Sequence, residues 1–316
     1  MSHASKPGIA HTLTGNVRTY EEFHSRYLEH DRTIIVYLPP GYDTRSAQRH
    51  PVLYLHDGQN VFDRATSIGE EWHVDEAAQA LILGGEIQPL IVVGIYNTGV
   101  HRIDEYTPTA TADGGGRAAD YGRMLVEELK PFIDATFSTL PSAASTALGG
   151  SSLGGLLTLT LGLRYSTAFS RLAVMSPSVW WDDRVILREV EALPHKLPLR
   201  IWLDAGTAEG DQVISDAEAL RDALVAKGWI LGEDLSYLEA KGGEHNEQSW
   251  AAPHRRRAEV SLSSALTHRT CTASTSAGSA RRSNAKWTCW CSATPARAPW
   301  CFRARWGASL NGRIRG

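Results

Sequence analysis

A short glycine-flanked segment contains the residues best suited to nucleophilic chemistry. Gly150-Ser151-Ser152-Leu153-Gly154 matches the pattern G-x-S-x-G. In a nucleophile elbow, a sharp turn between a strand and a helix exposes one hydroxyl, and glycines prevent a Cβ from clashing with the neighbouring elements. The register of the pattern selects Ser152, rather than Ser151, as the nucleophile. The alternative is a serine that only caps the start of a helix.

A serine nucleophile needs a base to take its proton and an acid to orient that base. His245 is the candidate base, because it follows the last predicted strand in the glycine-rich segment 241–247. The other histidines after Ser152 lie in a proline-flanked connection or near a C-terminal change in composition. The alternative for His245 is an ordinary exposed loop histidine.

Three carboxylates are candidates for the orienting acid. Glu209 is preferred, because it lies just past a predicted strand, where its carboxylate could reach Nδ1 of His245. Asp204 is still within that strand or at its end, and Asp211 could instead be the N-cap of the following helix. All three fit the chain order Ser, acid, His that is typical of hydrolases with a nucleophile elbow.

The elements that must position these residues alternate between strands and helices. The first strand ends at two prolines, and the segment before it, Val17–Tyr27, is a candidate antiparallel partner. The alternation predicts an α/β fold with a mostly parallel central sheet and helices on both faces. The predicted strands are 32–40, 51–57, 90–96, 146–148, 171–177, 199–206 and 235–240, and the predicted helices are 118–137, 153–165 and 211–227.

Composition excludes several classes of protein. The net charge of −3 and the 42 % of hydrophobic residues are unlike a disordered, collagen-like or coiled-coil chain. No run of apolar residues is long enough to span a membrane, and the N-terminus lacks the apolar region of a secretory signal. The first 250 residues contain no cysteine. These observations favour a cytoplasmic protein.

The composition changes abruptly near Trp250. Residues 251–316 contain 12 lysines and arginines against one acid, all 4 cysteines and 4 of the 10 tryptophans. The first 250 residues therefore carry a net charge of −3 − 11 = −14. The alternatives for 251–316 are a basic nucleic-acid or membrane arm, a cysteine-stapled or metal module, and a stretch foreign to the domain. We favour the last alternative. On this interpretation, residues 1–250 form a catalytic domain, and residues 251–316 are a poorly ordered product of a shifted reading frame.

Segments in a fixed order resemble the esterase-D-like branch of the α/β-hydrolases. This branch includes enterochelin, feruloyl and acetylxylan esterases, S-formylglutathione hydrolases and mycolyltransferases. The resemblance covers roughly residues 30–250. Its segments are Val36-Tyr-Leu-Pro-Pro-Gly-Tyr, Tyr54-Leu-His-Asp-Gly-Gln-Asn, Gly149-Gly-Ser-Ser-Leu-Gly-Gly, Ser176-Pro-Ser-Val-Trp-Trp, Gly206-Thr-Ala-Glu-Gly and Gly243-Glu-His-Asn.

The resemblance implies an α/β-hydrolase fold with Ser152 as nucleophile, His245 as base and Glu209 as acid. It further implies an oxyanion hole made by the backbone N–H groups of Leu153 and Gln59. Pocket residues would be Trp180, Trp181 and Asp57, with core packing as the alternative for the two tryptophans. Arg102 and Glu105 also match a family segment, and we interpret them as a structural or pocket-rim ion pair.

Together these features predict a serine esterase that works through an acyl-enzyme on a small-molecule ester, without a metal or an organic cofactor. The alternatives are an acyltransferase of the same fold and a non-catalytic binding protein. Nucleic-acid binding is opposed by the acidic first 250 residues. In the family a helix follows the catalytic histidine and packs on the sheet, whereas here Pro253 interrupts that pattern. The sequence identifies neither the ester nor the oligomeric state.

Overall fold

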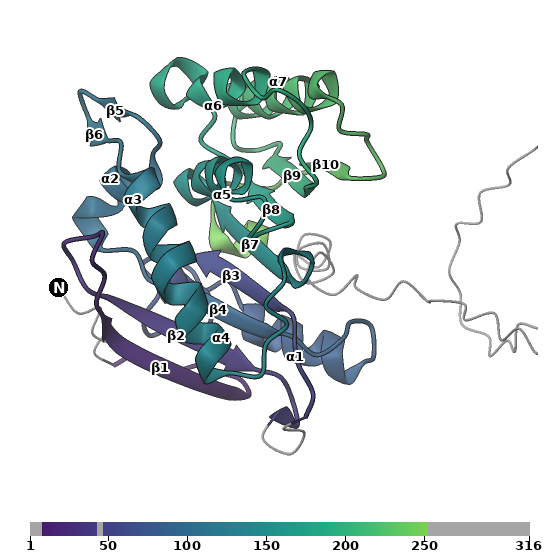
Figure 1. Cartoon of the computed structure of the whole chain (residues 1–316). Coiled ribbons are helices and arrows are strands. Elements are labelled where there is room, and N and C mark those ends of the chain that lie inside the picture. Colours follow the sequence, from purple (N-terminus) through teal and green to yellow (C-terminus); the bar gives the residue numbers. More distant parts are fainter. Residues whose placement is uncertain (1–7, 43–46, 252–316) are drawn as a thin grey trace, which may run out of the picture. The chain divides into compact units, whose positions relative to one another are not determined.

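An eight-stranded sheet runs through the part of the chain that the computed structural model describes, residues 8–42 and 47–251 (Figure 1). Its strand order is β1-β2-β4-β3-β7-β8-β9-β10. The pairs β1/β2 and β2/β4 are antiparallel and the others are parallel, so the predicted mostly parallel sheet is confirmed. The strands are β1 Asn16–Phe23, β2 Arg32–Leu38, β3 Val52–His56, β4 Ile91–Ile95, β7 Thr146–Ser151, β8 Arg171–Met175, β9 Arg200–Gly206 and β10 Leu235–Ala240.

Successive residues of the central strands face opposite sides of the sheet, which is why these strands are almost continuously apolar. In β2, Ile34, Val36 and Leu38 belong to one buried core cluster, whereas Ile35 and Tyr37 belong to the other. Helices α3 (Ala118–Arg123), α4 (Lys130–Thr136), α5 (Leu153–Arg164), α6 (Trp181–Glu191) and α7 (Asp211–Lys227) contribute to the core on the first face, and α1 (Val74–Leu83) covers the second (Figure 1).

The helices confirm most of the predicted boundaries. They are α1 Val74–Leu83, α2 Arg102–Tyr106, α3 Ala118–Arg123, α4 Lys130–Thr136, α5 Leu153–Arg164, α6 Trp181–Glu191, α7 Asp211–Lys227 and α8 Glu247–Trp250. The predicted helix 118–137 is divided by a π-helical segment, Met124–Leu129. Helix α7 ends at its predicted boundary, Lys227, and Gly228 follows with a φ of 111°, the left-handed conformation typical of a glycine C-cap. The small hairpin of β5 (Ala110–Thr111) and β6 (Gly114–Gly115) lies between α2 and α3 in the chain.

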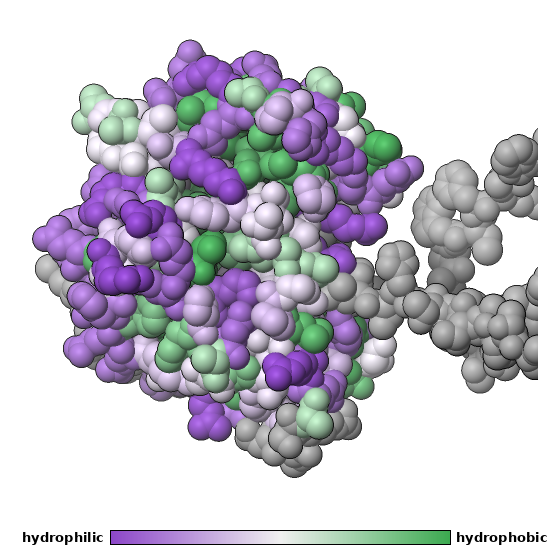
Figure 2. All heavy atoms as spheres, viewed as in Figure 1, coloured by the Kyte–Doolittle hydropathy of each residue, from purple (hydrophilic) through white to green (hydrophobic). Residues whose placement is uncertain are grey.

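Among the described residues, no helix has both the length and the apolar character needed to cross a membrane. Figure 2 shows a face on which hydrophilic residues predominate and hydrophobic residues occur in small, separate areas. The atypical segment predicted at 251–316 lies, apart from Ala251, outside the described residues.

Candidate active site

The strand–turn–helix geometry predicted around Ser152 is present. Strand β7 ends at Ser151 and α5 begins at Leu153, so Ser152 is the single residue between them. Its backbone has φ 59° and ψ −124°, a strained conformation for a residue with a side chain. A Cβ at Gly150 would lie 2.8 Å from the carbonyl oxygen of Gly154, too close for any side chain. The elbow therefore requires glycine at that position.

His245 and Glu209 meet although they are 36 residues apart in the sequence. The His245 Nδ1 lies 2.6 Å from Glu209 Oε2. His245 follows β10 and Glu209 follows β9, and these two strands are parallel neighbours. Because carboxyl ends of parallel strands meet at one edge of a sheet, the loops after them bring the two side chains together. The His245 side chain remains 44 % exposed, whereas that of Glu209 is fully buried.

Hydrogen bonds hold the buried Glu209 carboxylate in its charged form. Its Oε1 accepts from Ser176 Oγ at 2.7 Å and from the Gly206 N–H at 2.7 Å. Burial acts to raise the pKa of Glu209, but the bonds from His245 and Ser176 outweigh it and lower the pKa below its ordinary value. The carboxylate is therefore suited to orient the imidazole through Nδ1–H.

The turn after β8 contacts both halves of the site. Ser178 Oγ lies 3.4 Å from Ser152 Oγ, and Ser176 Oγ, besides donating to Glu209, accepts from Trp250 Nε1 at 3.0 Å. The Trp250 ring packs edge-on against the His245 ring, with centroids 5.1 Å apart. Within the described residues Ser152 Oγ and His245 Nε2 share no hydrogen bond, and such bonds often form only in the substrate complex.

The predicted oxyanion loop is held from several sides. Asp57 has φ 56°, and a Cβ at the next residue, Gly58, would lie 2.5 Å from the backbone of β4. Gln59 is completely buried, and its Oε1 accepts from the Asn97 N–H at 3.2 Å. At the other predicted donor, Leu153 is the first residue of α5, where helical N–H groups have no partner within the helix.

Asp57 does not offer a free carboxylate to a pocket. Arg102 Nε and Nη2 donate to its two oxygens at 2.7 Å each, and Asn97 Nδ2 donates to Oδ1 at 2.7 Å. Burial disfavours the charged carboxylate, but the guanidinium outweighs this and lowers the pKa of Asp57. The interpretation of Arg102 and Glu105 as a pair with each other is wrong, because Arg102 pairs with Asp57.

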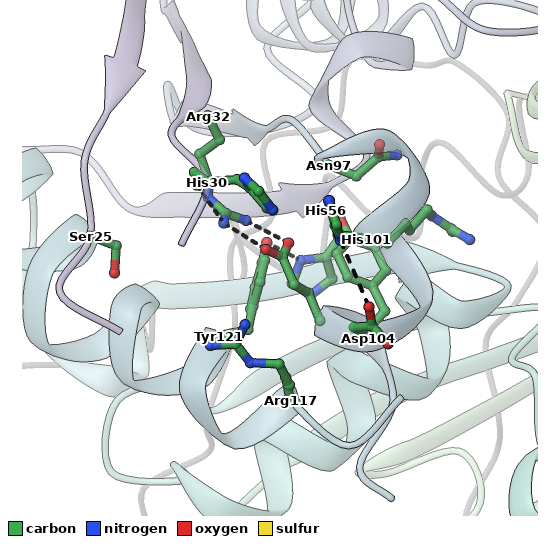
Figure 3. Close-up of polar contacts among 12 residues, drawn as sticks. Ser25, His30, Arg32, His56, Asn97, His101, Asp104, Arg117 and Tyr121 are labelled. Carbon is green, nitrogen blue, oxygen red and sulfur yellow. Dashed lines mark hydrogen bonds and ion pairs between the residues drawn. The ribbon is translucent and has the colours of Figure 1, made fainter. Parts of the chain in front are cut away.

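Glu105 instead pairs with Arg32, behind the site. Arg32 Nη1 and Nη2 donate to its two oxygens at 3.0 Å each, and both side chains are almost fully buried. Figure 3 shows Arg32 beside Tyr121, whose hydroxyl lies 3.0 Å from Nδ1 of the buried His56. Burial and the nearby Arg102 lower the pKa of His56 to about 3, which keeps this imidazole neutral. These groups form a structural network rather than a second acid–base pair.

The two tryptophans have different environments. Trp181 is only 3 % exposed, belongs to the core and donates from Nε1 to the Thr109 carbonyl at 3.2 Å. Trp181 is therefore a core residue, which was the alternative stated for both tryptophans. Trp180 is 56 % exposed and is free to line a pocket. Helix α6, which follows Trp180, is not among the predicted helices.

The two alternative acids do not contact His245. Asp204 is fully buried within β9, where its Oδ2 accepts from Trp202 Nε1 at 2.8 Å. Asp211 is exposed and is the first residue of α7, after the cap residue Gly210. Of the three predicted carboxylates, the structure brings Glu209 to the imidazole.

Four residues that contact the site, Ser176, Ser178, Asn60 and Glu247, are not among the site residues predicted from the sequence. Asn60 Nδ2 donates to Glu247 Oε1 at 2.6 Å, which joins the predicted oxyanion loop to the helix that follows His245. Ser176 and Ser178 follow β8, Asn60 lies in the loop after β3, and Glu247 is two residues after His245. These positions near strand ends and near the predicted base could have indicated them.

Comparison with known proteins gives one family and several relatives. The family model described as "Putative esterase" matches residues 25–257. The siderophore triacetylfusarinine C esterase of Aspergillus fumigatus is 32 % identical over 179 residues, which cover 52 % of this chain and 59 % of that protein. The uncharacterized protein YbbA of Bacillus subtilis is 25 % identical over 232 residues, covering 69 % and 87 %.

A solved structure supports the fold. The enterobactin esterase FES from Shigella flexneri has a TM-score of 0.62 at 21 % identity, with 82 % of this chain and 60 % of that chain covered. This likeness confirms the predicted α/β-hydrolase architecture.

Proposed function

The chain belongs to the esterase family and is a carboxylic-ester hydrolase, and we propose that Ser152, His245 and Glu209 carry out its reaction. The observation that carries this proposal is the 2.6 Å contact between His245 Nδ1 and Glu209 Oε2, at the sheet edge where Ser152 occupies a strained elbow. A carboxylate, an imidazole and a hydroxyl delivered by three strands of one sheet are the parts that acyl transfer requires.

In the acylation step, Ser152 Oγ attacks the ester carbonyl carbon while His245 Nε2 takes the hydroxyl proton. Glu209 keeps the Nδ1–H bond and stabilises the imidazolium that forms. The Ser152 hydroxyl must leave the weak 3.4 Å contact with Ser178 to align with the base. The C–O bond to the alcohol then breaks, and the alcohol departs with the proton from Nε2.

The negative charge that develops on the carbonyl oxygen needs fixed donors. We assign these to the backbone N–H groups of Leu153 and Gln59. The start of α5 supports the first assignment, and the tightly held 3₁₀ turn Gly58–Asn60 supports the second. Removing one such donor in other hydrolases slows the reaction by a factor of about 10²–10³.

In the deacylation step, which follows departure of the alcohol, water attacks the acyl-enzyme with His245 as base, and Ser152 is restored.

The proposed substrate is a small-molecule ester with an apolar or aromatic part. Trp180, Ile68 and Val100 are large hydrophobic residues left 56 %, 60 % and 87 % exposed. They belong to the segments that follow Ser178, Asn60 and Asn97. Ser178 contacts Ser152, Asn60 is part of the proposed oxyanion loop, and the Asn97 N–H donates to Gln59 Oε1. An aromatic substituent stacked on Trp180 would gain contact area without disturbing the core.

The test is hydrolysis of p-nitrophenyl acetate and butyrate by the native chain beside Ser152→Ala. We expect the variant to lose a factor of about 10³ or more in kcat/KM. Ser151→Ala is the matched control, because Ser151 is the neighbouring hydroxyl that the elbow register rejects. A fluorophosphonate should label Ser152 alone, as read by peptide mass. Full activity in Ser152→Ala, or label on another residue, would refute the assignment.

A further inference from the structure

A second group of titratable side chains surrounds the start of α1 and has no part in the proposed reaction. Glu71, His73 and Glu76 each offer one ligand atom, and these atoms all lie within 4.8 Å of one another. His73 Nδ1 is 3.1 Å from Glu76 Oε1 and 3.5 Å from Glu71 Oε1. We propose that these three side chains bind a divalent transition-metal cation.

The buried Glu71 supplies the strongest reason for a bound cation. Glu71 is 1 % exposed, and its Oε2 accepts from Thr12 Oγ1 at 2.7 Å. Its Oε1 is buried, has no hydrogen-bond donor among the described residues, and faces the His73 ring nitrogen. A buried carboxylate oxygen without a donor is costly. A cation between Glu71, His73 and Glu76 would satisfy this oxygen.

The spacing and the types of ligand indicate which cations fit. A tetrahedral zinc site with bonds of about 2.0–2.1 Å places its ligand atoms about 3.3 Å apart. The 3.1 Å and 3.5 Å separations from His73 Nδ1 lie on either side of that value. One imidazole and two carboxylates suit Zn²⁺ or Mn²⁺ better than Ca²⁺ or Mg²⁺, which prefer oxygen ligands alone.

The surrounding charge also favours a cation. Asp75 is fully buried beside Glu76, and the two carboxyl groups share a hydrogen bond. Asp63 is 3 % exposed and pairs with His11 Nδ1 at 2.6 Å. Carboxylates gathered in one place repel each other unless they are protonated or paired.

A cation here would join three parts of the chain. Thr12 and Thr14, from the N-terminal segment, bond to Glu71 and Asp75. The segment that contains Glu71 and His73 pairs with the oxyanion loop, through the Trp72 N–H to the Asn60 carbonyl at 2.8 Å. Binding of the cation should therefore stabilise the fold and the proposed oxyanion loop, without contact between the cation and the reacting atoms.

The experiment measures binding by the full-length protein, treated with EDTA and then titrated with Mn²⁺ or Zn²⁺. We expect one site by calorimetry, a rise of several degrees in the melting temperature, and a visible absorption band when Co²⁺ is the probe. His73→Asn should weaken Mn²⁺ binding at least tenfold. Asparagine tolerates the positive φ of 59° at this position, so the backbone need not change. Glu76→Gln should have a similar effect, because it removes a second ligand charge.

Glu70→Gln is the matched control, since Glu70 is a half-exposed neighbour whose ion-pair partner is Arg64. It should bind Mn²⁺ within twofold of the native affinity. Native-like binding by His73→Asn and Glu76→Gln would overturn the proposal, because metal would then bind elsewhere. A native chain that takes up no cation would overturn it equally.

Discussion

Substitution of Glu209 by Gln tests the proposed triad most directly. The neutral amide keeps the shape of the side chain but replaces a carboxylate that accepts from His245, Ser176 and Gly206. One of the two carboxylate oxygens would be replaced by an NH₂ group, which cannot accept a hydrogen bond from the donors that face it. The imidazole would lose the partner that fixes its tautomer. In a serine protease the equivalent change lowers kcat about 10⁴-fold. Because His245 here is 44 % exposed, water can partly replace the partner, and we expect a loss of about 10³-fold, or about 4 kcal/mol.

The assay is the pH dependence of kcat/KM for p-nitrophenyl butyrate, with thermal unfolding measured on the same samples. Loss of charge-assisted bonds to a fully buried group should also lower the free energy of unfolding by about 1.5–3 kcal/mol. Asp211→Asn and Asp204→Asn are the controls, since neither carboxylate contacts His245. Glu209 is not the acid of the triad if Glu209→Gln keeps more than about a tenth of the activity while either control loses it.

Three further changes probe the surroundings of the site. Glu105→Ala leaves the Arg32 guanidinium buried without its partner and should cost about 3–5 kcal/mol in urea unfolding; a native midpoint would contradict a buried pair. Trp181→Ala should cost about 3–5 kcal/mol, because the ring is in the core, whereas Trp180→Ala should change stability by less than about 0.5 kcal/mol and raise KM for aryl esters. The lowered pKa of Asp57 makes its ionised form a source of stability above the ordinary value of 3.8. This contribution should be lost as the pH falls through the lower folded pKa, and melting temperatures between pH 5 and 2 should show it.

The elbow and the acid–base pair could be predicted because local constraints determine them. The clash at Gly150 fixes the turn around Ser152 regardless of the rest of the chain. Residues that follow parallel strands are brought to one edge of the sheet, so the loop positions of Glu209 and His245 were sufficient. Periodicity was enough for α7, where apolar spacing and a terminal glycine agree.

The pairings between distant residues could not be predicted, because the sequence pattern encodes burial and not partners. Arg102 and Glu105 are three residues apart, a spacing that makes a local pair available. The structure instead uses Asp57, 45 residues away, and Arg32, 73 residues away. Helix α6 was missed although its buried residues Val185, Ile186 and Val190 have helical spacing, and in the structure three residues near its start, 182–184, have positive φ.

The turn after β8 explains how the proposed nucleophile and the proposed acid, which follow different strands, keep a fixed separation. The sheet order places β8 between β7, which leads to Ser152, and β9, which leads to Glu209. Ser178 contacts Ser152, through a 3.0 Å backbone bond to its carbonyl as well as the hydroxyl contact, and Ser176 bonds to Glu209. His245 has no such direct link to the nucleophile. It is held by Glu209 and by the Trp250 ring, and both of these hydrogen-bond to Ser176 Oγ. The position of the proposed base relative to Ser152 therefore depends in part on one buried hydroxyl, beside the Gly206 N–H that also bonds to Glu209. Loss of that hydroxyl should disturb the imidazole before it disturbs the elbow.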